Sequence, residues 1–263
     1  MGVANATPDS FSDAGQFLCT KAVIDHALQL IDEGADILDI GGESTRPGAQ
    51  PVTEADELAR ILPVLRACRD AAIPISVDSM KPSVMRIALA EGASMINDVN
   101  ALRLPGAMQA VADSDCLLCL MHMQGEPRSM QVDPRYDDVV SEVAQFLQQR
   151  AQACVQSGID PARIVLDPGF GFGKTLQHNL ALLRGLGELS ALGYPVLAGL
   201  SRKSMIGALT GRPAAERLSL IHISEPRDAQ RGATILRVHD VAETRDAMAV
   251  WHALEQSSSA CTA

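Results

Sequence analysis

The sequence predicts a single-domain α/β protein in which eight βα units close into a (β/α)8 TIM barrel, and three observations support this. Eight short apolar, β-branched runs recur along the chain, each followed by a longer stretch with helical periodicity. The runs are apolar almost throughout, as expected of parallel strands that are buried on both faces. The length of 263 residues suits such a barrel, which typically has about 250 residues. A doubly wound open sheet is the alternative fold.

The expected strands follow one another at regular intervals. They are residues 2–4, 35–40, 74–77, 94–96, 116–121, 163–166, 195–200 and 234–238. The first is truncated, because the chain starts inside it. We therefore expect a weakened seam between the first and the eighth strand.

The expected helices lie between the strands. In residues 21–33, 54–71, 82–91 and 136–157, Leu, Val and Ala recur at steps of three and four, which is typical of amphipathic helices. Glycines follow several of these stretches, where a helix C-terminus favours positive φ. No linker, repeat or shift in composition divides the chain. We therefore assign residues 1–256 to the barrel and 257–263 to a flexible C-terminal tail.

Composition excludes several classes of protein. The apolar fraction is 47% and the charged fraction 21%, which argues against disorder. The net charge of −10 argues against nucleic acid as a partner. No apolar run approaches the length of about 18 residues that a membrane helix needs, and no signal peptide precedes Asp9. We expect a cytoplasmic protein that binds no membrane and keeps its six cysteines reduced.

One cysteine pair has the spacing of a redox or metal motif. Cys116 and Cys119 lie in an expected strand, where residues three apart point to opposite faces. Two separate core thiols are therefore favoured over a redox or metal pair.

Polar residues stand where each expected strand ends, which is the face on which barrels place their active sites. In chain order they are Asn5, the run from Gly41 to Arg46, Asp78, Asn97 and Asp98, His122, Asp167, the run from Ser201 to Lys203, Arg237 and His239. Any one of them could be an ordinary helix cap or turn residue. Together they predict one polar mouth. Asp and Asn side chains suit the N–H and amino groups of a flat heterocycle, and clustered cations suit a diphosphate.

A glycine-rich stretch near the sixth strand imitates a phosphate-binding loop. The pattern would need glycine at Pro168, so the Walker interpretation fails. We expect instead that Gly169, Gly171 and Gly173 let the backbone approach a planar ligand, with Phe170 or Phe172 stacking on it. A plain flexible loop is the alternative.

At these positions the sequence resembles dihydropteroate synthases. The matching blocks span nearly the whole chain in the family's order. They are Asn-Ala-Thr-Pro-Asp-Ser-Phe-Ser-Asp from Asn5, Gly-Gly-Glu-Ser-Thr-Arg-Pro-Gly from Gly41, Val-Asp-Ser from Val77, Ile-Asn-Asp-Val from Ile96, Met-His-Met-Gln-Gly from Met121, Asp-Pro-Gly-Phe-Gly-Phe-Gly-Lys from Asp167, Ser-Arg-Lys-Ser from Ser201 and Arg-Val-His-Asp from Arg237.

The resemblance implies condensation of 6-hydroxymethyl-7,8-dihydropterin diphosphate with 4-aminobenzoate, which releases pyrophosphate in folate synthesis. It implies a catalytic set of Asp78, Lys203, Arg237 and His239. It implies substrate contacts by Thr45, Arg46, Pro47, Asp78, Asn97, Asp167, Phe172, Lys203, Ser204, Arg237 and His239. Asn5 is expected to hold Mg²⁺, the implied cofactor, against the diphosphate. The resemblance also implies that sulfonamides inhibit the protein. It implies a homodimer as a possible assembly.

One segment departs from the resemblance. Residues 219–229 stand where the family has an Ala/Leu-rich helix, yet they carry β-branched residues and Pro226. The segment lies where the family's subunits usually pair, and it has the character of a foreign insertion or an artefact of the sequence. With the truncated first strand, it makes a non-catalytic or poorly folding homologue the alternative. A corrinoid-linked methyltransferase barrel is disfavoured, because it has no use for Arg46, Lys203 and Arg237.

Overall fold

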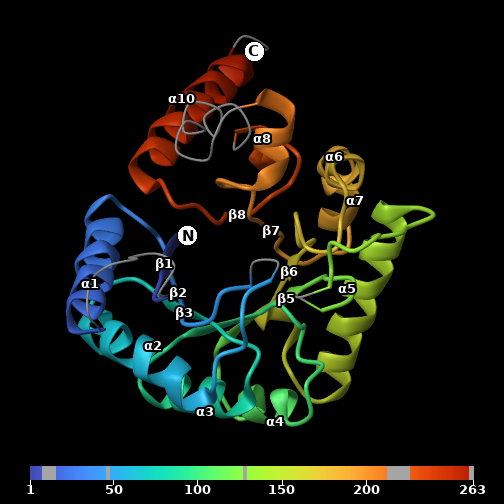
Figure 1. Cartoon of the computed structure of the whole chain (residues 1–263). Helices are drawn as coiled ribbons and strands as arrows, with labels where there is room; N and C mark the ends of the chain where they lie inside the picture. Colours follow the sequence, from blue (N-terminus) through green and yellow to red (C-terminus); the bar gives the residue numbers. More distant parts are fainter. Residues whose placement is uncertain (8–15, 46–47, 127–128, 212–225, 261–263) are drawn as a thin grey trace.

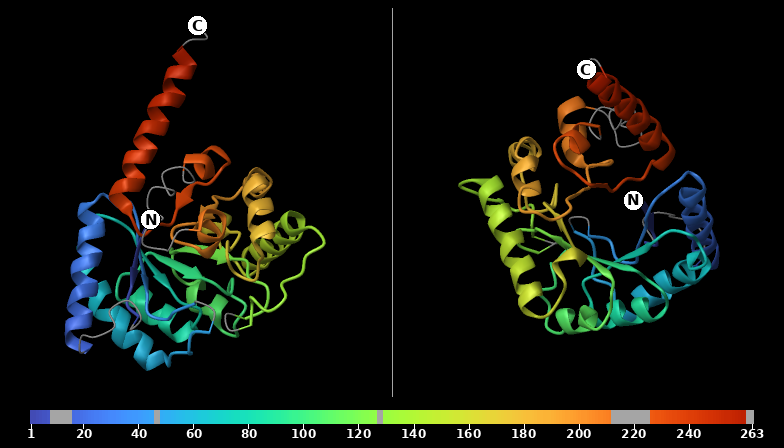
Figure 2. Two further views of the ribbon diagram at one scale, coloured as in Figure 1. Left: turned by 45° about the horizontal axis from the view of Figure 1, so that its top comes forward. Right: turned by 180° about the vertical axis from the view of Figure 1, so that it is seen from behind.

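The structure, a computed structural model, describes residues 1–7, 16–45, 48–126, 129–211 and 226–260. Strands and helices alternate along the chain, and the helices surround the strands (Figures 1 and 2). The α/β barrel predicted from the sequence is therefore confirmed. Among the described residues, no helix is both long and apolar enough to cross a membrane.

The strands form two parallel sheets. The first has six strands in the order β1 (Gly2–Asn5), β2 (Leu38–Gly41), β3 (Ile75–Asp78), β4 (Met95–Asp98), β5 (Leu117–Met121) and β6 (Ile164–Asp167). The second pairs β7 (Leu197–Ala198) with β8 (Ile235–Leu236). Single bridges join β6 to Val196 and β1 to Val238, which closes the barrel on both sides. The seventh and eighth strands are thus shorter than predicted.

The helices lie outside the strands. They are α1 (Gln16–Asp32), α2 (Glu54–Cys68), α3 (Pro82–Ala90), α4 (Ala107–Ala112), α5 (Val139–Gln156), η2 (Pro161–Arg163), α6 (Leu176–Arg184), α7 (Leu186–Ser190), α8 (Ser204–Thr210) and α10 (Val241–Ala260). Side chains of N-cap residues accept backbone hydrogen bonds at the start of several of these helices. Thr53 accepts from Asp56 N at α2, Asp138 accepts from Val140 N at α5, and Thr175 forms a capping box at α6.

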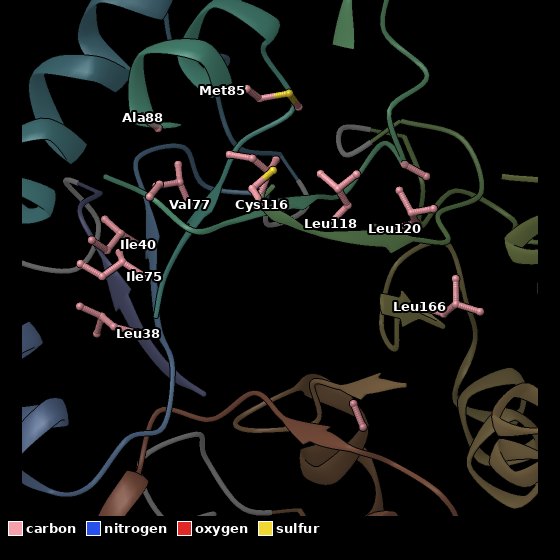
Figure 3. Close-up of a cluster of buried hydrophobic side chains, with 14 of the residues drawn as sticks. Leu38, Ile40, Ile75, Val77, Met85, Ala88, Cys116, Leu118, Leu120 and Leu166 are labelled. Carbon is pink, nitrogen blue, oxygen red and sulfur yellow. The ribbon is translucent and has the colours of Figure 1, made fainter. Parts of the chain in front are cut away.

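The core has two layers. Strand residues such as Leu38, Ile40 and Val77 point outward against the helices (Figure 3). A smaller cluster of Met1, Met95, Cys119, Val165 and Leu197 fills the barrel interior. Cys116 belongs to the outer layer and Cys119 to the inner one, and both thiols are free, so the prediction of two separate core thiols is confirmed.

The C-terminal region differs from the sequence-based boundaries. Helix α10 continues through Ala260 and extends away from the barrel in Figure 2, so the predicted boundary at residue 256 falls inside this helix. Residues 261–263 lie outside the described residues, and the flexibility of the tail stays a prediction. Most of the atypical segment 219–229 also lies outside them. Its described part, residues 226–229, is helical.

Candidate active site

The register of the first sheet gathers polar residues at the carboxyl ends of the strands. Asn5, Gly41, Asp78 and Asn97 are consecutive partners across β1 to β4. Gly41 leaves space between its neighbours, because a Cβ there would lie 3.6 Å from Asp78 Cβ and 3.7 Å from Asn5 Oδ1. Asn5 and Asp78 therefore face the same opening.

Arg237, which follows β8, reaches across the barrel to the first sheet. Its Nε donates to Asp39 Oδ2 at 2.7 Å, and its terminal nitrogen donates to Asp78 Oδ2 at 2.9 Å. Asn97 Nδ2 lies 3.4 Å from the same Asp39 oxygen. Asp39 Oδ1 and Asn97 Oδ1 are buried and have no hydrogen-bond partner among the described residues. Buried acceptors in this state suit a ligand that brings N–H donors.

Burial and charge act against each other in this group. Burial raises the pKa of Asp78 to about 7, while the guanidinium of Arg237 opposes the shift. For Arg237, burial disfavours the charged form, but Asp39 and Asp78 outweigh burial and hold its pKa above the usual range. Arg237 therefore stays a cation beside two carboxyl groups, of which Asp78 titrates near neutral pH.

A second cluster forms around Asp167, at the end of β6. Asp167 Oδ1 accepts from Gly169 N at 2.7 Å, and burial raises the pKa of this carboxyl group. Lys203 donates to the carbonyl oxygen of Phe170, and its Nζ lies 4.8 Å from the centre of the Phe172 ring. Burial lowers the pKa of Lys203 to about 8, with Asp167 opposing the shift.

His239 lies beside Ser201, because its Nδ1 is 3.1 Å from Ser201 Oγ, which also accepts from the backbone N–H of His239 at 3.2 Å. Thr45 is half-buried in the segment after β2. Arg46 and Pro47 lie outside the described residues. Ser204 is the first residue of α8, and its side chain also lies outside the described part of the chain.

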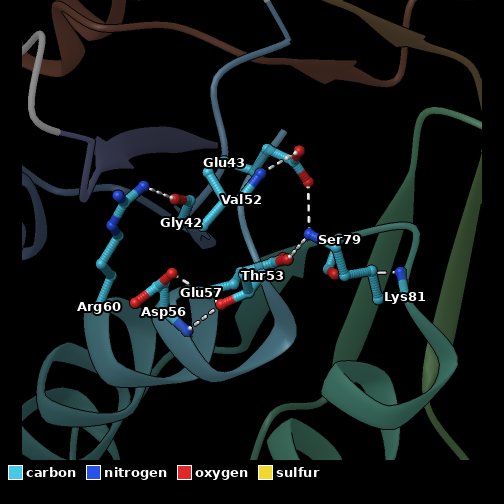
Figure 4. Close-up of polar contacts among 9 residues, drawn as sticks. All are labelled: Gly42, Glu43, Val52, Thr53, Asp56, Glu57, Arg60, Ser79 and Lys81. Carbon is cyan, nitrogen blue, oxygen red and sulfur yellow. Dashed lines mark hydrogen bonds and ion pairs between the residues drawn. The ribbon is translucent and has the colours of Figure 1, made fainter. Parts of the chain in front are cut away.

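A polar cluster fixes both ends of the segment that carries Thr45 (Figure 4). Glu43 accepts from Val52 N at 3.1 Å and pairs with Lys81 Nζ at 2.6 Å. Lys81 also pairs with Glu57, which is fully buried on α2. Residues 43 and 52 are therefore held close together at the edge of the mouth.

Three polar residues of the predicted mouth serve the scaffold. Both oxygens of Asp98 accept from backbone amides, at Asn100 and Leu102. His122 is buried beside Lys174. Arg202 pairs with Asp240.

The glycine-rich stretch also corrects two expectations. Phe170 is fully buried in the outer core, so it cannot stack on a ligand. A Cβ on Gly169 or Gly173 would overlap a carbonyl oxygen, of His122 and Gln124 respectively. These two glycines therefore allow a close approach to the neighbouring loop rather than to a ligand. Phe172 is half-buried beside Lys203, where the sequence placed a ligand contact.

Asp39 is the site residue that the sequence reasoning missed. It lies inside a strand, between the buried Leu38 and Ile40, whereas the predicted site residues stand at strand ends. A carboxyl group inside a continuous apolar strand was the available signal, because such a group is rarely buried without a partner.

The described residues contain no group of three or more His, Cys, Asp or Glu that could hold a metal ion. Asn5 supplies one amide oxygen beside Asp78. Mg²⁺ keeps several waters and is often held by one or two protein oxygens plus substrate phosphates. Asn5 therefore fits an ion that is held mainly by a diphosphate.

A comparison with protein families shows that this barrel with its polar mouth is a pterin-binding enzyme. The model of the family described as "Pterin binding enzyme" matches residues 1–239.

The individual relatives narrow this class. The dihydropteroate synthase of Haemophilus influenzae is 49% identical over 254 residues, which cover 96% of this chain and 92% of that protein. The structure of the Xanthomonas albilineans enzyme with 4-aminobenzoic acid is similar with a TM-score of 0.92 and 53% identity, over 97% of this chain and 92% of that one. A Yersinia pestis dihydropteroate synthase in a sulfonamide complex gives a TM-score of 0.92 and 43% identity, over 98% and 93%. This chain belongs to the dihydropteroate synthase family, and its activity is that of a transferase.

Proposed function

We propose that the chain joins 6-hydroxymethyl-7,8-dihydropterin diphosphate to 4-aminobenzoate through the residues described above. The observation that carries the proposal is the position of Arg237, which contacts Asp39 and Asp78 at the mouth of the barrel. A guanidinium there offers charge to a diphosphate, while the carboxyl groups beside it offer acceptors to the pterin ring.

The pterin site comprises Asp78, Asn97, Asp167 and Lys203. The buried Asn97 Oδ1, which lacks a partner among the described residues, supports a role as acceptor for a ring N–H or amino group. Asp167 and Lys203 bring opposite charges to the other side of the ring. Asp39, with its second buried oxygen free of described partners, adds a further acceptor at the base of this site.

In the reaction, the bond between the pterin CH₂ and the diphosphate oxygen breaks, and the electron pair leaves with the diphosphate. The amine of 4-aminobenzoate then forms a bond to the CH₂ and loses a proton. Asp78 stabilises the positive charge that develops on the pterin. Arg237 and His239 bind the leaving diphosphate. Asn5 would help to hold Mg²⁺ together with the diphosphate, and the ion would supply positive charge to the leaving group.

The aminobenzoate site comprises Thr45, Arg46, Pro47, Phe172 and Ser204. The Xanthomonas albilineans enzyme has been solved with 4-aminobenzoic acid, which supports this ligand here. The half-buried ring of Phe172 beside Lys203 supports a flat aromatic ligand. Thr45 and Arg46 belong to the segment held at Glu43 and Val52.

Release of pyrophosphate tests the activity. With both substrates and Mg²⁺ we expect continuous release, and with Mg²⁺ removed we expect the rate to fall. If pyrophosphate appears at the same rate without 4-aminobenzoate, the chain hydrolyses the diphosphate and the proposal is wrong. If no release occurs from a folded chain with both substrates, the non-catalytic alternative gains support.

Inhibition tests the aminobenzoate site separately. The Yersinia pestis structure with a sulfonamide drug supports this class as inhibitors. A sulfonamide presents an aniline nitrogen on a flat ring, so we expect competition with 4-aminobenzoate and restoration of the rate as that substrate is raised. Failure of the drug to inhibit an active enzyme at comparable concentrations would contradict this site.

The proposal also includes the location of the protein in the cell and its assembly. A cytoplasmic location is supported by the buried free thiols of Cys68, Cys116, Cys119 and Cys154. A homodimer is supported by the exposed apolar side chains of Val250 and Leu254 on α10. Sedimentation velocity gives the mass of the assembly directly, and a single monomeric species at micromolar concentration would contradict the dimer.

A further inference from the structure

Lys174 is a buried amine for which the proposed reaction has no use. Its side chain follows the glycine-rich stretch after β6, and the residue is 3% exposed. Its Nζ donates to Phe172 O at 2.9 Å, Gly169 O at 3.0 Å and His122 O at 3.3 Å, and lies 2.9 Å from His122 Nδ1. One side chain thus binds two loops, those that follow β5 and β6.

The backbone explains why these carbonyl groups converge. Gly169 and Gly173 have positive φ, at +67° and +62°, and each packs without a side chain against the loop that follows β5. Two backbones this close leave no room for water between them, so their carbonyl oxygens need a donor from the protein. Lys174 is that donor for Gly169, Phe172 and His122.

The same loop holds the site residues. The backbone N–H of Gly169 donates a hydrogen bond to Asp167 Oδ1. The carbonyl oxygen of Phe170 accepts a hydrogen bond from Lys203, and the ring of Phe172 lies against the same lysine. The backbone positions that Lys174 fixes, at Gly169 and Phe172, lie on either side of Phe170. Any shift of this loop therefore moves Phe172 and the carbonyl group that orients Lys203.

We propose that Lys174 is a positioning residue, whose hydrogen bonds to the carbonyl oxygens of Gly169 and Phe172 set the place of Phe172 for 4-aminobenzoate beside Lys203 of the pterin site. The inference rests on the proposed function, since it assigns a specific task within that site. Lys174 contacts no substrate. Its effect reaches the reaction through the loop alone.

The test compares Lys174→Met, which keeps length and removes the donor, with Lys21→Met at an exposed position on α1 as the matched control. Displacing Phe172 weakens its contact with the aromatic ring of the ligand, so we expect the KM for 4-aminobenzoate and the inhibition constant of a sulfonamide to rise about tenfold in Lys174→Met, which corresponds to about 1.4 kcal/mol of binding free energy. Pyrophosphate affinity, which depends on Arg237 and His239, should stay within about twofold. Lys21→Met should match the wild type.

A purely structural role gives a different pattern. The turnover number would then fall with the folded fraction while both constants stayed at wild-type values, and this result would overturn the proposal. If Lys174→Met does not fold, Lys174→Gln is measured in the same way, because its amide can still donate two hydrogen bonds. Wild-type protein without turnover would contradict the proposed function instead. An active wild type with unchanged constants in the variant would contradict only the inference.

Discussion

The two walls of the barrel are built differently, and the active site draws on both. Strands β1 to β6 have four or five residues each and pair in one continuous ladder. Strands β7 and β8 have two residues each, and single bridges join them to the rest. We call β1 to β6 the long wall and β7 with β8 the short wall. The long wall carries Asp78, Asn97 and Asp167, whereas Lys203, Arg237 and His239 follow the strands of the short wall.

Because of this difference, the site residues also contribute to closing the barrel. Strands β7 and β8 are short and form few backbone hydrogen bonds. Contacts between side chains therefore contribute more to holding them against the rest of the barrel. Arg237 connects the short wall to Asp39 and Asp78 of the long wall. The same contacts therefore orient the guanidinium that we propose for the diphosphate and hold the eighth strand in place.

Removing this connection should give the largest effect. Arg237→Met leaves the fully buried Asp39 without its cation, and breaking a buried pair in this way costs about 3–5 kcal/mol. We also expect weaker binding of the diphosphate substrate than of 4-aminobenzoate. Urea unfolding and substrate affinity check the two expectations.

The control is Arg202→Gln, which removes another arginine–carboxylate pair beside the short strands. Arg202 is half-exposed where it meets Asp240, so its loss should cost no more than about 1 kcal/mol. Equal losses in the two variants would contradict a special role for Arg237 in closing the barrel.

A change on the long wall should separate chemistry from closure. Asp78→Asn keeps the shape of the side chain but removes its charge, so we expect turnover to fall about 10²–10³-fold. The stability should change less than in Arg237→Met, because Asp39 still pairs with the guanidinium. Turnover within a few-fold of wild type, measured by pyrophosphate release, would rule out the role given to Asp78.

The effect of pH on kcat/KM should be smaller than the effects of these substitutions. We expect an acidic limb from a residue of the long wall and an alkaline limb from a residue of the short wall. In the proposed reaction Asp78 stabilises the pterin cation only when ionised, so with its pKa at about 7 we expect kcat/KM to fall as the pH drops below that value. Lys203 is a cation only below its pKa of about 8, so kcat/KM should also fall as the pH rises beyond it. Asp78→Asn should lose the acidic limb and keep the alkaline one. An unchanged profile in that variant would assign the acidic limb to another group.

The sequence predicted the order of the strands and several of the polar residues that gather at the mouth, because both follow local patterns, while the roles of these residues stay predictions. Apolar runs mark buried strands, and polar residues after them mark the mouth, as Asp78, Asn97 and Asp167 illustrate. The apolar neighbours of Asp39 mark it as an unusual buried carboxyl group, but they do not reveal its partner, because Arg237 lies 198 positions away. The shortness of β7 and β8 was also hidden, because apolar runs do not reveal how many backbone pairs form.

The contacts of the buried groups of Asp98 and Lys174 could not be predicted from the sequence either. The sequence placed Asp98 at the mouth, but its oxygens turn back to the amides of Asn100 and Leu102. It offered no task for Lys174, whose three carbonyl partners are brought together only when two loops pack. Such roles follow from tertiary contacts and not from spacing.

Amide hydrogen exchange of wild type and Arg237→Met tests the link between site and closure most directly. We expect the amides of β7, β8 and residue 238 to exchange much faster in the variant, while those of β3 to β5 keep most of their protection, because opening begins at the weakly paired strands β7 and β8. Unchanged protection of β8, or an equal loss of protection in all eight strands, would contradict it.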